Sequence, residues 1–179
     1  MKMRVMVTLL WIMSGRRTAG FFPLPDDVPY FSFRGMGFEA VPCRVYDGDT
    51  FSSVFLYRGE WIKWRCRCLG YDSPEMKPPL LQPDREEEKS RAIQARDRFQ
   101  ELLTRTPSVW IRCGDFDKYG RLLVVVSSFS SSTSTTNTTI NDQMLAEGMG
   151  VPYSPYTGRS LRKLYSSRDE QNSSSYGSP

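Results

Sequence analysis

The stretch FEAVPCRVYDGDTFSSVFLYRGEWIKWRCRCL, residues 38–69, decides the fold. It contains three runs that are rich in β-branched and aromatic residues, 38–46, 50–57 and 61–69. Asp47-Gly48-Asp49 separates the first two runs, and Arg58-Gly59-Glu60 separates the last two. Runs of this length, joined by short turns that contain glycine, are typical of antiparallel hairpins. The stretch therefore predicts a three-stranded meander.

The residues after the meander predict a helix, two more strands and a short second helix. Three prolines between positions 78 and 83 enforce a loop, after which Asp84 is expected to cap a helix over 85–103. That helix has one apolar stripe on an otherwise charged surface, which predicts that the stripe packs on the core. The stripe consists of Ala92, Ala95, Phe99, Leu102 and Leu103. The two strands are expected over 108–114 and 121–128, and the short helix over 140–147 before Gly148.

Five strands with a helix between the third and the fourth have the order of an OB-fold. We therefore expect an α+β protein built on a five-stranded Greek-key β-barrel. The run 127–139 is almost entirely Ser and Thr, which predicts a loop insertion without chemistry of its own, and the tail 158–179 has a similar polar composition. A chain of 179 residues accommodates one such domain with tails.

Composition restricts the chemistry that the chain can perform. It contains no histidine, which excludes serine–histidine and cysteine–histidine catalysis and zinc sites that use imidazole ligands. The formal net charge of +4 and the pI near 8.9 suit an anionic partner, although a balance this mild also serves solubility. Catalysis would have to use carboxylates, arginine, lysine, tyrosine or a bound ion.

The four cysteines leave two interpretations open. Cys43, Cys66, Cys68 and Cys113 form no CxxC pair, so a zinc site is not expected. In a strand, Cys66 and Cys68 would share the face opposite Arg67 and act as small buried hydrophobic residues. The alternative is a disulfide, for example between Cys43 and Cys113, which requires an oxidising compartment.

The N-terminal segment 1–36 also has two interpretations. A basic start and the apolar run 5–13, followed by small residues at 18–20, are typical of a secretory signal, but Arg16 and Arg17 fit it poorly. The alternative is an extension ahead of a domain that begins near Gly37. The chain would be secreted in the first case and intracellular in the second. The run is too short for a stable membrane span, which needs roughly 20 apolar residues.

Four short stretches carry most of the information about function. They are Asp47-Gly48-Asp49-Thr50, Arg67, Asp72-Ser73-Pro74-Glu75 and Asp117-Lys118-Tyr119-Gly120-Arg121. Each alone is a common turn or helix start, but in this order and spacing the chain resembles the staphylococcal nuclease (thermonuclease) family. The resemblance covers about residues 38–156 and implies a nuclease domain over 37–157. The implied fold is an OB-fold barrel with about three helices, of which the last would lie near 158–168.

The resemblance also implies a role for each site residue. Asp49, Asp72 and the Ser73 carbonyl would bind Ca²⁺, a cation that prefers oxygen ligands, and Asp47 would brace the turn from the second shell. Arg67, Glu75 and Arg121 would be catalytic, with the arginines on the phosphate and the glutamate on the attacking water. The substrate would contact Lys118, Tyr119, Tyr153 and Tyr156.

The function implied is a Ca²⁺-dependent, sugar-nonspecific nuclease that hydrolyses DNA and RNA and leaves 3′-phosphates. Stacking on tyrosine tolerates any base, so a preference for single-stranded or frayed substrates is expected. We expect a monomer. The alternative is a non-catalytic OB-fold module that binds single-stranded nucleic acid or a protein partner, with the carboxylates serving only to turn the hairpins.

Overall fold

The computed structural model describes residues 18–19, 22–23, 25–128, 138–154 and 159–160, and it comprises two compact units, 1–32 and 33–179. In the first unit, β1 (Thr18–Ala19) pairs with β2 (Phe22–Pro23), and a 3₁₀ turn, η1, covers Pro25–Asp27. The signal-like run 5–13, most of the Ser/Thr-rich insertion and most of the tail lie outside the described residues. No helix in the described ranges has the length and apolar character needed to cross a membrane.

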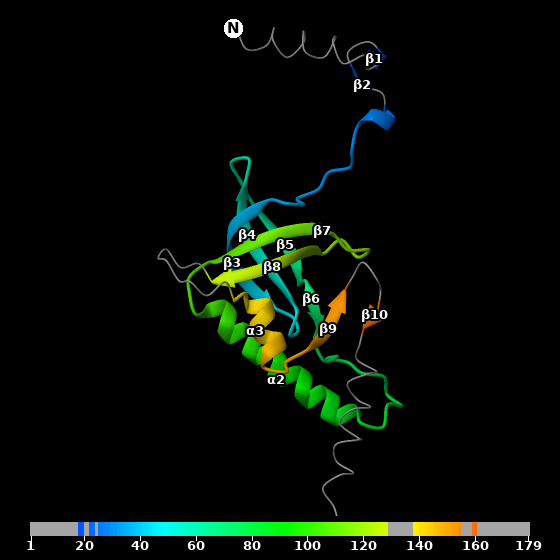
Figure 1. Ribbon diagram of the computed structural model, residues 1–179, viewed down its shortest axis with the longest axis vertical. Coiled ribbons are helices and arrows are strands. Elements are labelled where there is room, and N and C mark those ends of the chain that lie inside the picture. The colour runs from blue at the N-terminus through cyan, green and yellow to red at the C-terminus, as the bar shows by residue number, and fades with distance from the viewer. Residues whose placement is uncertain (1–17, 20–21, 24, 129–137, 155–158, 161–179) are drawn as a thin grey trace, which may run out of the picture. The chain divides into compact units, whose positions relative to one another are not determined.

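The second unit is built on a closed five-stranded barrel (Figure 1). Its strands are β3 (Gly37–Val45), β4 (Thr50–Tyr57), β5 (Glu60–Cys68), β7 (Val109–Phe116) and β8 (Leu122–Ser128). Around the barrel they follow the order β3-β4-β5-β8-β7, and β7 closes the ring by pairing with β3. This is the order of an OB-like barrel, so the predicted fold class, α+β with a five-stranded barrel, is confirmed at this level.

Strand alternation explains why the meander forms a barrel wall. Phe51 and Phe55 of β4 and Cys66 and Cys68 of β5 point inward and are almost completely buried. Arg67 therefore lies on the opposite face of β5, as the sequence predicted. The β5–β8 pair is the parallel one, with Cys66 opposite Leu122, and parallel neighbours need a long crossover between them.

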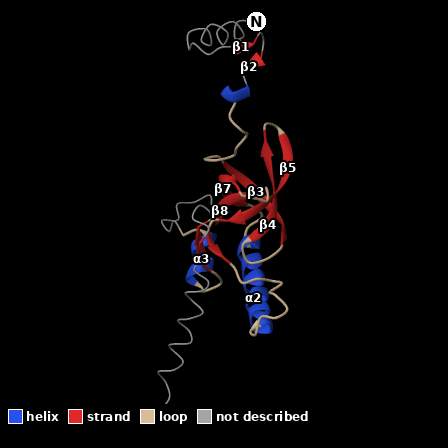
Figure 2. Ribbon diagram, turned by 90° about the vertical axis from the view of Figure 1, so that its right-hand side faces the viewer, coloured by secondary structure: helices blue, strands red, loops and turns tan. Residues whose placement is uncertain are grey.

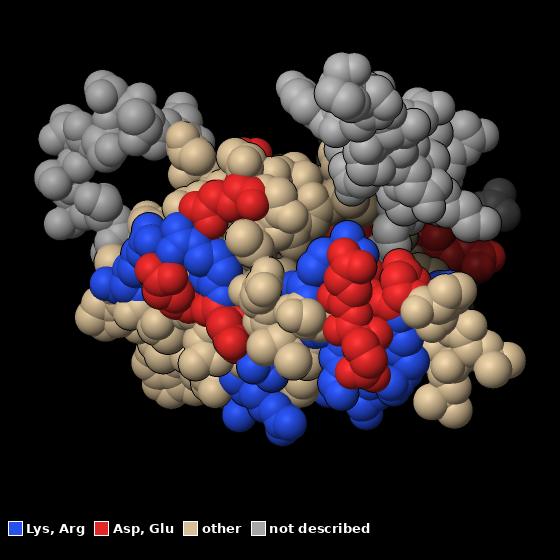
Figure 3. Space-filling model, turned by 90° about the horizontal axis from the view of Figure 1, so that it is seen from below, with Lys and Arg blue, Asp and Glu red and all other residues tan. Residues whose placement is uncertain are grey.

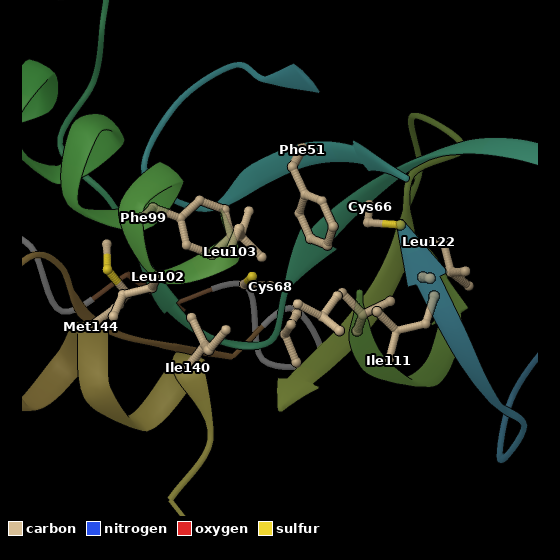
Figure 4. Packing of buried hydrophobic residues seen from close by; sticks show 14 of the residues in the cluster. Phe51, Cys66, Cys68, Phe99, Leu102, Leu103, Ile111, Leu122, Ile140 and Met144 are labelled. Carbon is tan, nitrogen blue, oxygen red and sulfur yellow. The ribbon is translucent and has the colours of Figure 1, made fainter. Parts of the chain in front are cut away.

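Two α-helices lie at the same end of the barrel (Figures 1 and 2). They are α2 (Arg85–Thr104), which belongs to that crossover, and α3 (Ile140–Ala146), which follows β8. The predicted stripe of α2 is buried, and Phe99, Leu102 and Leu103 pack with Ile140 and Met144 of α3 against the barrel interior (Figure 4). A bidentate ion pair, from Arg98 Nε and Nη2 to the two carboxylate oxygens of Glu147 at 2.6 and 2.7 Å, joins α2 to the C-terminal end of α3.

A small second sheet was not predicted. It has the order β10-β9-β6 and consists of β6 (Gly70–Asp72), β9 (Val151–Ser154) and β10 (Arg159–Ser160). β10 takes the start of the segment in which a third helix was expected, and 161–168 lie outside the described ranges. The part of the chain that the structure describes thus has two α-helices, where about three were expected. Gly158 and a shortage of apolar positions are the physical reasons why that segment is a weak helix former.

One local expectation was wrong. Asp84 precedes α2, but its side chain makes no capping hydrogen bond and instead accepts one from Gln82 Nε2. The better-capped helix is α3, where the Thr139 hydroxyl accepts from Asp142 N and the Asp142 carboxylate accepts from Thr139 N. All four cysteines are free, with Cys43 exposed and the others buried, so the expected packing role holds for three of them and the disulfide does not form.

Candidate active site

A pocket of about 600 Å³ opens on the second unit, where several turns and strand ends meet. Its walls come from the β3–β4 turn, the end of β5, the loop after β6, the β7–β8 turn and β9. Every site residue that the sequence predicted and that the structure describes lines this pocket. Those residues are Asp47, Asp49, Arg67, Asp72, Ser73, Glu75, Lys118, Tyr119, Arg121 and Tyr153. Tyr156 lies outside the described residues.

Arg67 bridges two carboxylates at the base of the pocket. Its Nη1 donates to Asp49 Oδ1 and its Nη2 to Asp72 Oδ1, both at 2.7 Å. Only 12% of the Arg67 side chain and 3% of the Asp49 side chain are exposed. Burial acts to lower the pKa of Arg67, but the charges of Asp49 and Asp72 outweigh it and raise the pKa. One guanidinium thus holds a turn and a strand end together.

Both carboxylate oxygens of Asp49 accept hydrogen bonds. Its Oδ1 also accepts from the Thr50 hydroxyl at 2.8 Å, and its Oδ2 accepts from the Ser73 backbone N–H at 3.0 Å. Its own N–H donates to Asp47 Oδ1 at 3.1 Å, which bends the turn tightly. Burial raises the pKa of the Asp49 carboxyl to about 7, although the adjacent Arg67 guanidinium acts in the opposite direction. The cost of burying this charge is the reason why a cation has to lie against it.

Gly48 allows the turn to approach the rest of the site. A Cβ at this position would lie 2.8 Å from Ser73 Cβ and 2.9 Å from Ala95 Cβ, closer than real Cβ atoms come. The Gly48 carbonyl accepts a 2.6 Å hydrogen bond from the hydroxyl of Tyr71, a residue that is completely buried. Glycine is therefore required here for space, and the contact seats the turn against both β6 and α2.

The β7–β8 turn positions Arg121 through Asp117. Asp117 accepts from the backbone N–H groups of Tyr119 and Arg121 at 2.9 Å, and from Arg121 Nε at 2.6 Å. Burial acts to raise the pKa of Asp117, but these hydrogen bonds outweigh it and lower the pKa. Arg121 Nη1 also reaches the hydroxyl of Thr50 at 3.3 Å. Both arginines of the site therefore contact the Asp49–Thr50 pair.

Glu75 lies on the exposed wall of the pocket. Its backbone N–H donates to Glu88 Oε1 at 2.9 Å, and its own Oε1 accepts from Lys77 N at 3.2 Å. Glu88 belongs to the first turn of α2 and is nearly buried, so it anchors the loop that carries Glu75 to the helix. The Glu75 carboxylate is accessible to water.

Aromatic side chains stand beside both arginines. The guanidinium carbon of Arg67 lies 5.4 Å from the ring centroid of Tyr153, and that of Arg121 lies 5.5 Å from the ring centroid of Tyr119. Lys118 Nζ lies 5.0 Å from the same Tyr119 ring, which is 71% exposed. Tyr153 owes its position to the β6–β9 pairing, in which it stands opposite Gly70.

Sequence reasoning assigned no role to three residues that organise the site. Asp117 holds Arg121, Thr50 connects Asp49 to Arg121, and Glu88 anchors the Glu75 loop. The four-residue separation of Asp117 and Arg121 was a usable signal, because a tight hairpin turn brings its first and last residues together, as the 2.8 Å hydrogen bond from Asp117 N to the Arg121 carbonyl shows. Glu88 gave no signal, since it is one of three consecutive glutamates.

The site has oxygen ligands that suit a hard cation, and the Arg67 guanidinium bridges two of the residues that supply them, Asp49 and Asp72. Asp49, Asp72 and the Ser73 backbone supply only oxygen ligands, the type that Ca²⁺ and Mg²⁺ prefer. Within the described ranges, no three His, Cys, Asp or Glu side chains cluster closely enough to hold a metal ion. The donor types therefore fit Ca²⁺, provided that Arg67 releases carboxylate oxygens that it now holds.

Comparisons with known proteins add no relative: no protein-family model matches the chain, and no curated protein matches it.

Proposed function

We propose that the chain is a Ca²⁺-dependent nuclease that hydrolyses phosphodiester bonds of DNA and RNA, with an OB-fold domain of the staphylococcal nuclease type. One observation carries this proposal. Two arginines, two clustered aspartates and an accessible glutamate, from stretches that begin at Asp47 and end at Arg121, line a single pocket. These are the groups that an in-line displacement at phosphorus requires.

Asp49, Asp72 and the Ser73 carbonyl would hold the ion, and Asp47 would brace the turn beside them. When bound, Ca²⁺ supplies positive charge that polarises a phosphate oxygen and offsets the negative charge of the transition state. The two carboxylates are already close enough to share one guanidinium, so their side chains need little rearrangement to share an ion. Binding at this position would release Arg67 from at least one carboxylate.

The protein's own groups would perform the remaining steps. Arg67 and Arg121 would donate to the equatorial phosphate oxygens, where a planar guanidinium binds with two parallel hydrogen bonds. Loss of one such donor typically costs about 10²–10³ in rate. Glu75, on the solvent-accessible wall, would orient the attacking water and accept its proton. Cleavage on the 5′ side of phosphorus would leave a 3′-phosphate.

The substrate would be held by rings and by one cation at the pocket rim. Exposed Tyr119, with Lys118 beside it, and Tyr153 over Arg67 would stack on bases or sugars and contact the backbone. Tyr156 is proposed for the same role. Because stacking needs an unpaired base, single-stranded or frayed nucleic acid should be cleaved faster than a stable duplex. Faster cleavage of the duplex would contradict this part of the proposal.

A binding module without catalysis is a second candidate, and one observation favours it. Both carboxylate oxygens of Asp49 are engaged by Arg67, Thr50 and Ser73 in a buried network that needs no ion to be satisfied. Such a network can serve only to close the turn. In that case the barrel would bind single-stranded nucleic acid or a protein partner through the same rim.

Digestion of single-stranded DNA and RNA by the full chain tests the proposal. Cleavage is expected with Ca²⁺, and loss of cleavage is expected with chelator and in Arg121→Ala. Arg112→Ala is a matched control, because Arg112 is an exposed barrel arginine that does not line the pocket. Binding without cleavage by the wild-type chain under all conditions would refute the nuclease and establish the binding module.

The metal assignment has a test that does not depend on activity. Thermal unfolding with and without Ca²⁺ should show stabilisation of about 2.7 kcal/mol at an ion concentration 100 times the dissociation constant. Asp49→Asn and Asp72→Asn should abolish this gain and the Ca²⁺-dependent cleavage. A shift that persists in both variants would place the ion elsewhere.

A further inference from the structure

The outer face of β5 carries a row of cationic and aromatic side chains that leads away from the pocket. Alternate residues of a strand share one face, so Trp61, Lys63 and Arg65 lie on the same face as Arg67. Ile62, Trp64 and Cys66 face the core instead. Trp61, Lys63 and Arg65 are exposed, and Trp61 shows 70% of its surface to solvent. The row covers about 20 Å, at about 3.4 Å per residue.

A second cationic group stands beside this row on β3 and the turn that follows it. Arg44 and Arg65 lie against the same aromatic ring, with guanidinium carbons 4.8 and 4.6 Å from the ring centroid of Tyr46. The strand register explains the contact, because Ser52 of β4 stands between Arg44 and Arg65. The hydroxyls of Tyr46 and Ser52 share a 3.2 Å hydrogen bond that fixes the ring.

Among the described residues, these charges have no acidic partner within ion-pair distance. Arg44, Lys63 and Arg65 form no ion pair with any carboxylate in the described part of the chain. By contrast, every arginine of α2 is paired with a nearby Asp or Glu. Acidic and basic side chains accordingly lie next to one another on the face seen from below (Figure 3). Arg44 and Arg65 place two positive charges against the ring of Tyr46, and these charges would attract an anion to this face.

We propose that Arg44, Tyr46, Lys63, Arg65 and Trp61 form a track that binds the phosphodiester backbone of a single strand as it leaves the pocket. The chemistry indicates this partner: unpaired guanidiniums and an ammonium recognise phosphates, and Trp61 offers an exposed ring on which a base stacks. The row begins at Arg67 in the pocket, so the track continues the proposed active site. The inference rests on the proposed function and extends it to a substrate several nucleotides long.

The track has a measurable signature in the salt dependence of binding. Each phosphate neutralised on a single strand contributes a slope of about −0.7 to log K against log salt concentration. Removal of two such contacts should therefore make the slope shallower by about 1.4. Loss of stacking on Trp61 should weaken binding by on the order of tenfold.

The test compares two thymidine oligonucleotides binding to the full-length chain in the presence of chelator, so that no cleavage interferes. One is a dinucleotide, which fills the pocket alone, and the other has about eight residues, within the range of one OB-type barrel. The variants are Arg44→Gln/Arg65→Gln and, separately, Trp61→Ala. The control is Arg91→Gln/Arg96→Gln, which removes the same net charge from two arginines of α2. Thermal unfolding checks that each variant is folded.

The track predicts that Arg44→Gln/Arg65→Gln and Trp61→Ala bind the longer oligonucleotide more weakly, while their affinity for the dinucleotide changes little. The dependence of binding on salt concentration should become shallower in Arg44→Gln/Arg65→Gln and stay unchanged in the α2 control. An unchanged slope, an equal loss in the control, or no binding by the wild-type chain would overturn the track.

Cleavage assays run in parallel separate this inference from the proposed function. If the wild-type chain cleaves DNA, and Arg44→Gln/Arg65→Gln has the same salt dependence of binding as wild type, the nuclease stands and the track is refuted. If the wild-type chain does not cleave DNA, and Arg44→Gln/Arg65→Gln has a shallower salt dependence of binding than wild type, the track stands as a binding surface and the nuclease is refuted.

Discussion

Replacement of Gly48 by alanine should disturb the pocket through a single added methyl group. The new Cβ would meet Ser73 Cβ at 2.8 Å and Ala95 Cβ at 2.9 Å. Neither neighbour can rotate away, because a Cβ is attached directly to the backbone, here of the loop after β6 and of α2. The φ of Gly48 is not in the left-handed region, so the effect comes from lack of space and not from backbone strain.

The size of the effect follows from overpacking. Forcing a methyl group into a filled site typically costs about 1–3 kcal/mol, which corresponds to a fall in Tm of roughly 2–12 °C for a chain of this size. Gly114→Ala is the matched control, because its Cβ would meet Leu123 and Leu69 at an ordinary contact distance of 3.4 Å. Each substitution also lowers the entropy of the unfolded chain, worth about 0.4–1 kcal/mol, and this contribution cancels in the comparison.

Urea unfolding of the two variants, followed by tryptophan fluorescence, measures the difference. Gly48→Ala should have the lower free energy of unfolding by at least about 1 kcal/mol. Neither Gly48 nor Gly114 has a positive φ, so the difference between the variants reports chiefly on the space around each glycine, which for Gly48 is set by Ser73 and Ala95. If the two variants agreed within about 0.5 kcal/mol, the close packing of the β3–β4 turn described above would be wrong.

Three further predictions concern residues that hold the site and the helices. Asp117→Ala removes the carboxylate that positions Arg121, so DNA cleavage should fall about 10–100-fold while the protein stays folded; unchanged kcat would show that Arg121 needs no support. The Arg98 hydrogen bonds lower the pKa of Glu147 to about 2. Because this folded-state value is depressed, the stability it confers is present above about pH 4.5 and lost as the pH falls toward 2. Wild type should therefore exceed Glu147→Gln in denaturant midpoint at pH 7, and the gap should close in acid; a constant gap would contradict the ion pair. Asn141→Ala should cost about 2–4 kcal/mol in urea unfolding, because the buried amide bonds the Val126 N–H and the Leu69 and Val124 carbonyls, and a loss below about 1 kcal/mol would argue against this network.

The barrel could be predicted because each of its strands is identifiable from local sequence. The runs in 38–69 have their own alternation and their own glycine turns, and the structure places strands at Gly37–Val45, Thr50–Tyr57 and Glu60–Cys68. The second sheet could not be predicted. β6 has three residues and β9 has four with a proline, too few for a periodic pattern, and they exist because they pair with each other across about 80 positions.

The site shows the same limit. The residue types of Asp49, Arg67 and Asp72 were evident in the sequence, but their sharing of one guanidinium depends on how far the turn reaches into the barrel end. The position of Tyr153 depends on the unpredicted β6–β9 pairing. Asp84 makes no side-chain cap on α2, and its carboxylate instead accepts a hydrogen bond from the side chain of Gln82.

Closure of the barrel has a consequence for the order in which the chain can fold. The β3–β4–β5 meander is joined by tight turns and can form early, but β3 obtains its second neighbour only from β7, roughly 70 residues further along the chain. Such distant pairings are slow to form, because the entropy lost on closing a long loop precedes the gain from the contacts. Until β7 has paired with β3 and β8 has paired with β5, the two outer edges of the meander present unpaired backbone groups, which can pair with strands from other molecules. A truncated chain that ends before Val109 is therefore expected to self-associate rather than fold, and the nascent protein is most vulnerable to aggregation until both β7 and β8 have been synthesised.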